Sequence, residues 1–123
     1  MKDFRTLKVW EKAHLVTLAV YRLTENFPKC EMYGITSQMR RCSASVAANI
    51  AEGCGRTGNG DFHRFISSAV GSATELDYFL LLSRDLDLVV DDEYQKRHDQ
   101  IFEIKRILSS LIRSVKKARQ ALR

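Results

Sequence analysis

The chain has 123 residues, of which 45% are hydrophobic and 28% are charged. This length and balance fit one domain with its own core, so we expect residues 1–123 to form a single domain. The longest uncharged stretches, such as residues 42–51, are too short and polar to cross a bilayer, and the charged N-terminus does not match a signal peptide. The cysteines are odd in number and show no CxxC pair, which is typical of a reducing compartment. We therefore expect a cytoplasmic protein with no membrane partner.

The positive charge is concentrated at the end of the chain. The formal net charge is +5, and residues 99–123 alone contribute all of it, with seven basic side chains against Asp99 and Glu103. The other 98 residues are balanced, with 13 basic and 13 acidic side chains. The sequence therefore predicts a localised basic surface on its last element.

The first predicted element is a helix from about residue 7 to residue 26. Its apolar residues step by four and three, which is the spacing of one helical face, and Pro28 ends it because proline disfavours helical geometry at the preceding residue. The members of this face are Val9, Ala13, Val16, Val20, Leu23 and Phe27.

Three further helices follow. The second begins near Gly34 or Thr36 and ends at Gly53, a typical position for a glycine at a helix end. Residues 54–60 are a turn by composition, after which Asn59 or Asp61 can cap the third helix. Asp91 or Asp92 can cap a fourth helix that reaches the end of the chain.

No stretch alternates as a strand does, so the sequence predicts an all-α fold. Four long helices with short connections favour an up-down-up-down four-helix bundle. Two of these helices have apolar faces wider than one bundle requires, at Trp10, Leu15 and Leu18 and at residues 78–82. Self-association is the simplest way to cover them, so we expect a homo-oligomer.

Polar groups recur among small residues in residues 38–53 and 62–76. If the chain reverses near Thr57, antiparallel pairing places Arg40 or Arg41 near Glu75 in an ion pair that fixes the register. We expect Gly71 to lie in this close helix contact. The predicted structural polar core comprises Arg40, Arg41, Ser45, Asn49, Glu52, Ser72 and Glu75.

These groups could instead form a binding or catalytic site. However, no nucleophile–base pair is evident among them. A di-iron bundle needs two Glu-x-x-His motifs, whereas the chain has one, at residues 11–14. The glycine-rich turn lacks the spacing and lysine of a phosphate loop. We therefore expect no enzyme activity, no metal and no cofactor.

The basic residues of the last helix allow two interpretations. Cations near a helix C-terminus offset the helix dipole and keep a protein in solution. Alternatively, they bind nucleic acid, mainly through phosphates because aromatic residues are few on this helix. The candidate nucleic-acid-binding residues are Lys105, Arg106, Arg113, Lys116, Lys117 and Arg119.

Four segments resemble one bacterial family: FRTLKVWEKA (4–13), the FP pair with Glu31 and Gly34 behind it, QMRRCSASVAANIAEG (38–53) and FHRFISSAVGSATEL (62–76). This is the four-helix-bundle family named for proteins encoded in intervening sequences of 23S ribosomal RNA genes. The resemblance implies a homopentamer of up-down bundles and no enzymatic activity. The fold of this family is also similar to that of the accessory protein of diversity-generating retroelements, a basic pentamer that binds nucleic acid and a reverse transcriptase. The family positions that carry over are Trp10, Arg40, Arg41, Ser45, Asn49, Glu52, Gly53, Phe65, Gly71, Ser72 and Glu75.

The sequence thus predicts a non-enzymatic, oligomeric bundle that binds RNA or another nucleic acid through its last helix. The possible partners are a second copy of the chain, RNA or DNA, and a nucleic-acid-processing protein. The alternative is a protein–protein adaptor without nucleic-acid affinity.

Overall fold

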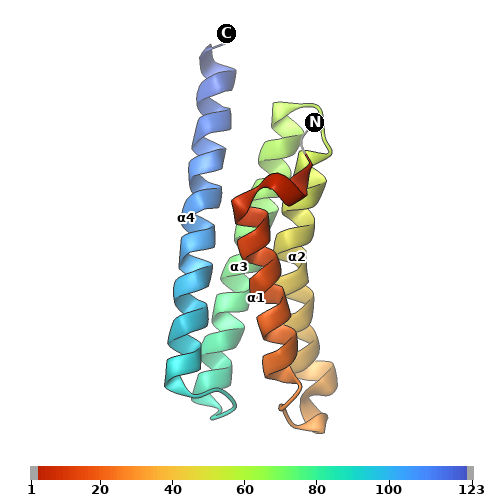
Figure 1. The fold of residues 1–123 in the computed structure, drawn as a ribbon, viewed down its shortest axis with the longest axis vertical. Helices are drawn as coiled ribbons and strands as arrows, with labels where there is room; N and C mark the ends of the chain where they lie inside the picture. The colour runs from red at the N-terminus through yellow and green to blue at the C-terminus, as the bar shows by residue number, and fades with distance from the viewer. Residues whose placement is uncertain (1–2, 122–123) are drawn as a thin grey trace.

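A computed structural model describes residues 3–121, apart from the side chain of Arg119. Four α-helices make up most of this range: α1 (Lys8–Thr24), α2 (Ser37–Cys54), α3 (Asn59–Asp85) and α4 (Asp91–Ala121). Consecutive helices run in opposite directions and pack lengthwise, and the last turns of α4 extend beyond the other three (Figure 1). We call this packing the bundle. The described residues include no strand, so the predicted all-α class is confirmed.

The ends of two helices differ from the prediction. Gly53 lies inside α2, and Gly55 is the C-cap whose N–H is shared by the carbonyls of Ala51 and Glu52. The N-cap of α3 is Gly58, which has no side chain to cap with, rather than Asn59 or Asp61. Glycine adopts the backbone conformations needed at a helix end without a capping side chain. In a glycine-rich turn, the position of a capping residue is therefore a weak guide to where a helix begins.

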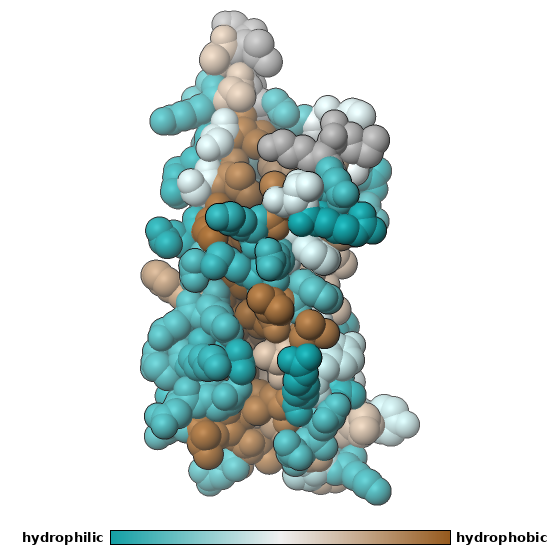
Figure 2. Space-filling model, viewed as in Figure 1, coloured by the Kyte–Doolittle hydropathy of each residue, from teal (hydrophilic) through white to brown (hydrophobic). Residues whose placement is uncertain are grey.

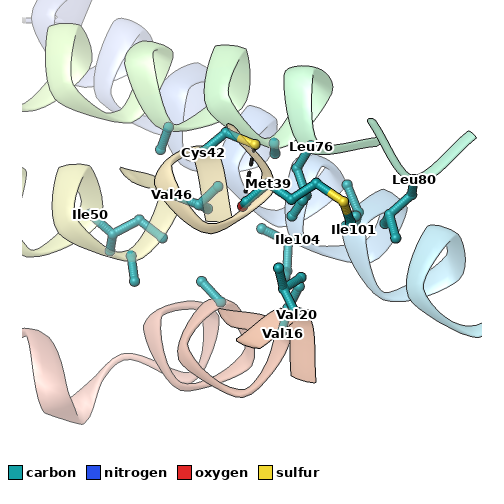
Figure 3. Close-up of a cluster of buried hydrophobic side chains, with 14 of the residues drawn as sticks. Val16, Val20, Met39, Cys42, Val46, Ile50, Leu76, Leu80, Ile101 and Ile104 are labelled. Atoms are coloured by element: carbon teal, nitrogen blue, oxygen red, sulfur yellow. Dashed lines mark hydrogen bonds between the residues drawn. The ribbon is translucent and has the colours of Figure 1, made fainter. Parts of the chain in front are cut away.

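The core fills the space between all four helices (Figure 3). Val16 and Val20 of α1 and Ile101 and Ile104 of α4 meet the apolar faces of α2 and α3, as the helical periodicity predicts. Leu86, by contrast, is 53% exposed and follows the last residue of α3 as its C-cap. The largest fully buried apolar side chains are Met39, Ile50, Ile66, Leu76, Leu80, Ile101, Ile104 and Leu108.

The interior leaves little empty space. A gap of about 10 Å³ lies in the core, bounded by side chains from all four helices that include Ala13, Ser43 and Ala73. A gap of this size holds one water molecule at most, so it has no room for a small-molecule ligand.

The close contact between α2 and α3 is made by Gly53, not by Gly71. A Cβ on Gly53 would lie 3.3 Å from Cβ of Phe65, which is tighter than most Cβ contacts, and 3.6 Å from Cδ1 of Ile66, which is an ordinary contact distance. A Cβ on Gly71 would meet nothing within 4 Å, because this residue lies on the exposed face of α3. The sequence-based prediction for Gly71 is wrong for the single chain, since the packing face of α3 lies on the other side of the helix.

Polar bonds attach α1 to α2. The Thr17 hydroxyl lies 3.0 Å from the carbonyl oxygen of Ser43, and Nε of Arg40 donates to the Thr24 hydroxyl at 2.8 Å. The Arg40 guanidinium also lies over the Tyr21 ring, 4.9 Å from its centroid. Arg40 is therefore a partner of α1, and only Arg41 reaches α3.

None of the helices in the described range is both long and apolar enough to cross a lipid bilayer.

Candidate functional site

The predicted basic residues of α4 lie on one face of this helix. With 3.6 residues per turn, Lys105, Arg106, Arg113, Lys116 and Lys117 cover about 120° of the helix circumference and about 18 Å of its length. Lys105 is half-buried and the other four are exposed. We call these five residues the basic face. The predicted sixth member, Arg119, has its side chain outside the described part of the structure.

The basic face differs from the rest of the molecule in how its charges are compensated. Elsewhere, seven cations form ion pairs with a carboxylate 2.8–3.5 Å away or, for Arg41, with Glu75; the other six are Arg5, Lys12, Arg56, Arg64, Arg84 and Arg97. No member of the basic face has an ion-pair partner within residues 3–121, and residues 104–121 contain no Asp or Glu. Among the other cations without an ion pair in this range, Arg22, Lys29 and Lys96 lie toward the opposite end of the bundle, whereas Lys8 begins α1.

The last turns of α4 stand beside the α2–α3 turn, across an open groove of about 400 Å³. Leu111 and Val115 of α4 line one side, and Phe62 and Gly58 line the other. Arg56 also borders the groove, but its guanidinium is held by Glu52 at 3.2 Å and by the Phe65 ring. The inner side of this segment is thus apolar, and its outer side is basic.

The polar residues between α2 and α3 form hydrogen bonds with one another. The hydroxyls of Ser45 and Ser72 are 2.9 Å apart, and Nδ2 of Asn49 donates to the Ser45 carbonyl and hydroxyl. Arg41 pairs with Glu75 and also donates to Gln38. The antiparallel register predicted from Glu75 is therefore present, with Arg41 as the partner.

Two members of the predicted polar core lie at the surface. Arg41 and Glu52 are exposed, and Glu52 forms a pair with Arg56 one helical turn away. The long side chains of Arg and Glu reach water from the edge of a helix, so a position near small residues does not bury their charges. The fully buried polar side chains are instead Thr24, Thr36, Ser43 and Ser83, which the sequence analysis missed.

Cys42 lies in the core beneath this polar cluster. Burial, reinforced by the Glu75 carboxylate and opposed by Arg41, raises the pKa of the Cys42 thiol from 9.0 to about 11. A thiol with so high a pKa stays protonated at neutral pH and is a poor nucleophile. Cys42 therefore serves as a small apolar core residue, and its thiol lies near the Met39 carbonyl (Figure 3).

An unpredicted polar contact joins α3 to α4. Nδ1 of His98 lies 2.8 Å from Oδ1 of Asp77, and the ring of Tyr94 stacks on the His98 imidazole. The residues are 21 positions apart on different helices, so nothing in the sequence links them. Within the described residues His98 makes no hydrogen bond to a Ser, Thr or Cys side chain, and its contact with Asp77 joins the two helices.

Two kinds of chemistry can be compared with this geometry, metal binding and the binding of anions. Within residues 3–121, no three or more of the side chains of His, Cys, Asp and Glu gather as a metal-binding group. The basic face places five cations without an ion-pair partner among these residues on one side of a single helix. What this arrangement can do chemically is bind anionic groups spaced along a surface.

Together these features define an all-helical bundle protein with a cationic face on its last helix. The model of the 23S rRNA-intervening sequence protein family matches residues 5–110, so the chain belongs to this family, as its motifs indicate. A solved structure with a similar fold is a protein of unknown function from the S23 ribosomal protein family of Bacteroides thetaiotaomicron VPI-5482, at 23% identity. The match covers 85% of this chain and 97% of that one with a TM-score of 0.77, which shows a shared fold. No curated protein matches the chain.

Proposed function

We propose that the protein is a non-enzymatic RNA-binding protein that contacts phosphates through the basic face of α4. The observation that carries this proposal is the contrast in charge compensation: seven cations elsewhere are paired with carboxylates, while the basic face has none within the described residues. Unpaired, solvated Lys and Arg side chains bind phosphates and release counterions, which is the main source of affinity without sequence preference.

Assembly would multiply this surface. We propose that the chains form a closed homo-oligomer, with the pentamer implied by the family resemblance as the expected state. A band of hydrophobic side chains runs lengthwise between the hydrophilic surfaces of α4 and α1 (Figure 2). Leu15 and Tyr78 are 54% and 57% exposed, although Phe79, Leu82 and Trp10 pack partly against the core of the same chain. Light scattering at micromolar concentration tests assembly, and the mass of a single chain would contradict it.

The RNA proposal is tested by charge reversal at the basic face. The variant carries Arg113→Glu, Lys116→Glu and Lys117→Glu, and the matched control carries Arg22→Glu, Lys29→Glu and Lys96→Glu at the other end of the bundle. All six residues are exposed, and both variants shift the net charge from +5 to −1, because each substitution changes it by two. Labelled hairpin and duplex RNA are titrated at low and physiological salt.

We expect the basic-face variant to lose binding, the control to keep most of it, and the parent affinity to fall steeply with salt. Equal losses in both variants would indicate a response to net charge alone. Binding that ignores salt would exclude phosphate contacts. Recovery of one protein partner from nuclease-treated lysate, with no RNA affinity, would favour an adaptor instead.

A cytoplasmic location remains part of this proposal.

A further inference from the structure

Phe102 lies on α4 at the beginning of the basic face. Its side chain is 64% exposed, although the neighbouring residues Ile101 and Ile104 are buried in the core. Lys105 and Arg106 follow three and four positions later, so they lie beside Phe102 on the helix surface. Single exposed apolar side chains are common and carry no function by themselves. The surroundings of Phe102 are what make it unusual.

Many of the aromatic rings in the described structure are occupied by a neighbour. Trp10 stacks on His14, Tyr94 stacks on His98, and arginines lie over the rings of Tyr21, Phe65 and Tyr94. Phe102 has no ring stacked on it and no cation over it within residues 3–121. The adjacent cations Lys105 and Arg106 likewise have no ion pair there. An open aromatic face and two uncompensated charges therefore lie within one helical turn.

This pairing matches the chemistry of an unpaired nucleotide. A base that is not in a duplex offers a flat face for stacking on an aromatic ring, and its phosphates accept hydrogen bonds from Lys and Arg. Arg106 lies one helical turn, about 6 Å along the axis, from Phe102. The side chain of Arg106 can therefore reach a phosphate of a nucleotide whose base is stacked on Phe102. In a continuous duplex the base faces are covered by neighbouring pairs, so Phe102 would have nothing to stack on.

We propose that Phe102 stacks on an unpaired base of bound RNA and directs the basic face toward loops and single strands rather than continuous duplex. The proposal rests on the RNA binding proposed above and adds a specificity residue to it. It also adds a base contact to the sequence-based expectation of binding mainly through phosphates, because the one exposed aromatic side chain of described α4 lies beside these cations.

The test compares a single-stranded RNA and a duplex of the same length on four proteins: the parent, Phe102→Ala, Phe102→Leu and Phe102→Tyr. We expect Phe102→Ala and Phe102→Leu to weaken single-strand binding by about tenfold and to leave duplex binding unchanged, because stacking of one base on an aromatic ring is lost. Phe102→Tyr keeps an aromatic face and should retain parental affinity. Rescue by Tyr but not by Leu would show that the ring, and not apolar bulk, is needed.

Each other outcome has a distinct meaning. Equal losses for both RNAs, or no loss in Phe102→Ala, would overturn the stacking role while leaving the proposed RNA binding in place. A change of mass in Phe102→Ala, measured by light scattering, would make Phe102 a contact between copies of the chain and would also overturn it. If the parent bound neither RNA, the proposed function itself would fail.

Discussion

The contact between α2 and α3 and the last turns of α4 use polar residues in opposite ways. Between α2 and α3, Ser45 is hydrogen-bonded to Ser72 and Arg41 is paired with Glu75. Gly53 lets the two helices approach closely. The last turns of α4 extend past the other helices and carry cations with no described partner (Figure 1). A polar group whose bonding capacity is already used specifies packing, whereas an uncompensated one remains available to a ligand. The comparison therefore separates the residues that pack the helices together from those proposed to bind a ligand.

The strongest test of the close α2–α3 contact is Gly53→Leu against Gly71→Leu. We expect Gly53→Leu to lower the free energy of unfolding by about 3 kcal/mol, because the added side chain collides with Phe65 and Ile66. Gly71→Leu should be neutral or should stabilise by up to about 1 kcal/mol, since leucine favours an exposed helix more than glycine does. Urea denaturation measures both. A similar loss for the two variants would mean that Gly71 is also buried, as it would be between subunits.

A second test makes the same substitution, valine to alanine, in each of the two regions and compares the loss of stability. Val46 of α2 is buried in the core, whereas Val115 of α4 is half-buried and lies on the groove beside the α2–α3 turn. Val46→Ala should cost about 2 kcal/mol, because two buried methyl groups are lost and a cavity remains. Val115→Ala should cost less than about 0.5 kcal/mol. If chemical denaturation gave equal costs, the last turns of α4 would be as tightly held as the body of the bundle.

The ion pair between Arg41 and Glu75 should contribute little to stability. Their side chains are 57% and 42% exposed, so water already solvates both charges. We expect Glu75→Ala to cost at most about 1 kcal/mol, far below the cost of a buried pair. A double-mutant cycle with Arg41→Ala isolates the pair, and a coupling energy above about 2 kcal/mol would contradict this solvated geometry.

The last prediction concerns Cys42, whose contribution to stability should vary with pH only in alkaline solution. Its pKa is raised in the fold from 9.0 to about 11, so the folded thiol holds its proton more tightly than the unfolded thiol. The stabilisation is therefore complete below pH 9 and is lost as the pH rises toward 11, because unfolding then releases a proton. The unfolding free energies of the parent and of Cys42→Ala, measured across this range, should converge as the pH rises. A constant difference would contradict the raised pKa.

The sequence by itself determined the class of fold and the approximate extent of each helix. Apolar residues at steps of three and four on α1, α2 and α4 are a local property of the chain, and Pro28 and the glycine-rich turn are local punctuation. The motifs also placed the chain in its family, and the count of charges placed the positive excess on the last helix. These features need no knowledge of which helices meet.

Only the tertiary structure decided how each polar or small residue is used. It places Gly53 and not Gly71 in the close helix contact, gives Arg40 and Arg41 different partners, exposes Glu52 and brings Asp77 to His98. It also left Phe102 open beside the basic face. The physical reason is that the apolar period determines only which broad face of a helix turns to the core, whereas the partners of residues at the edges of that face depend on the exact rotation and register of each helix against its neighbours. Partners across helices are therefore set by packing in three dimensions and not by spacing along the chain.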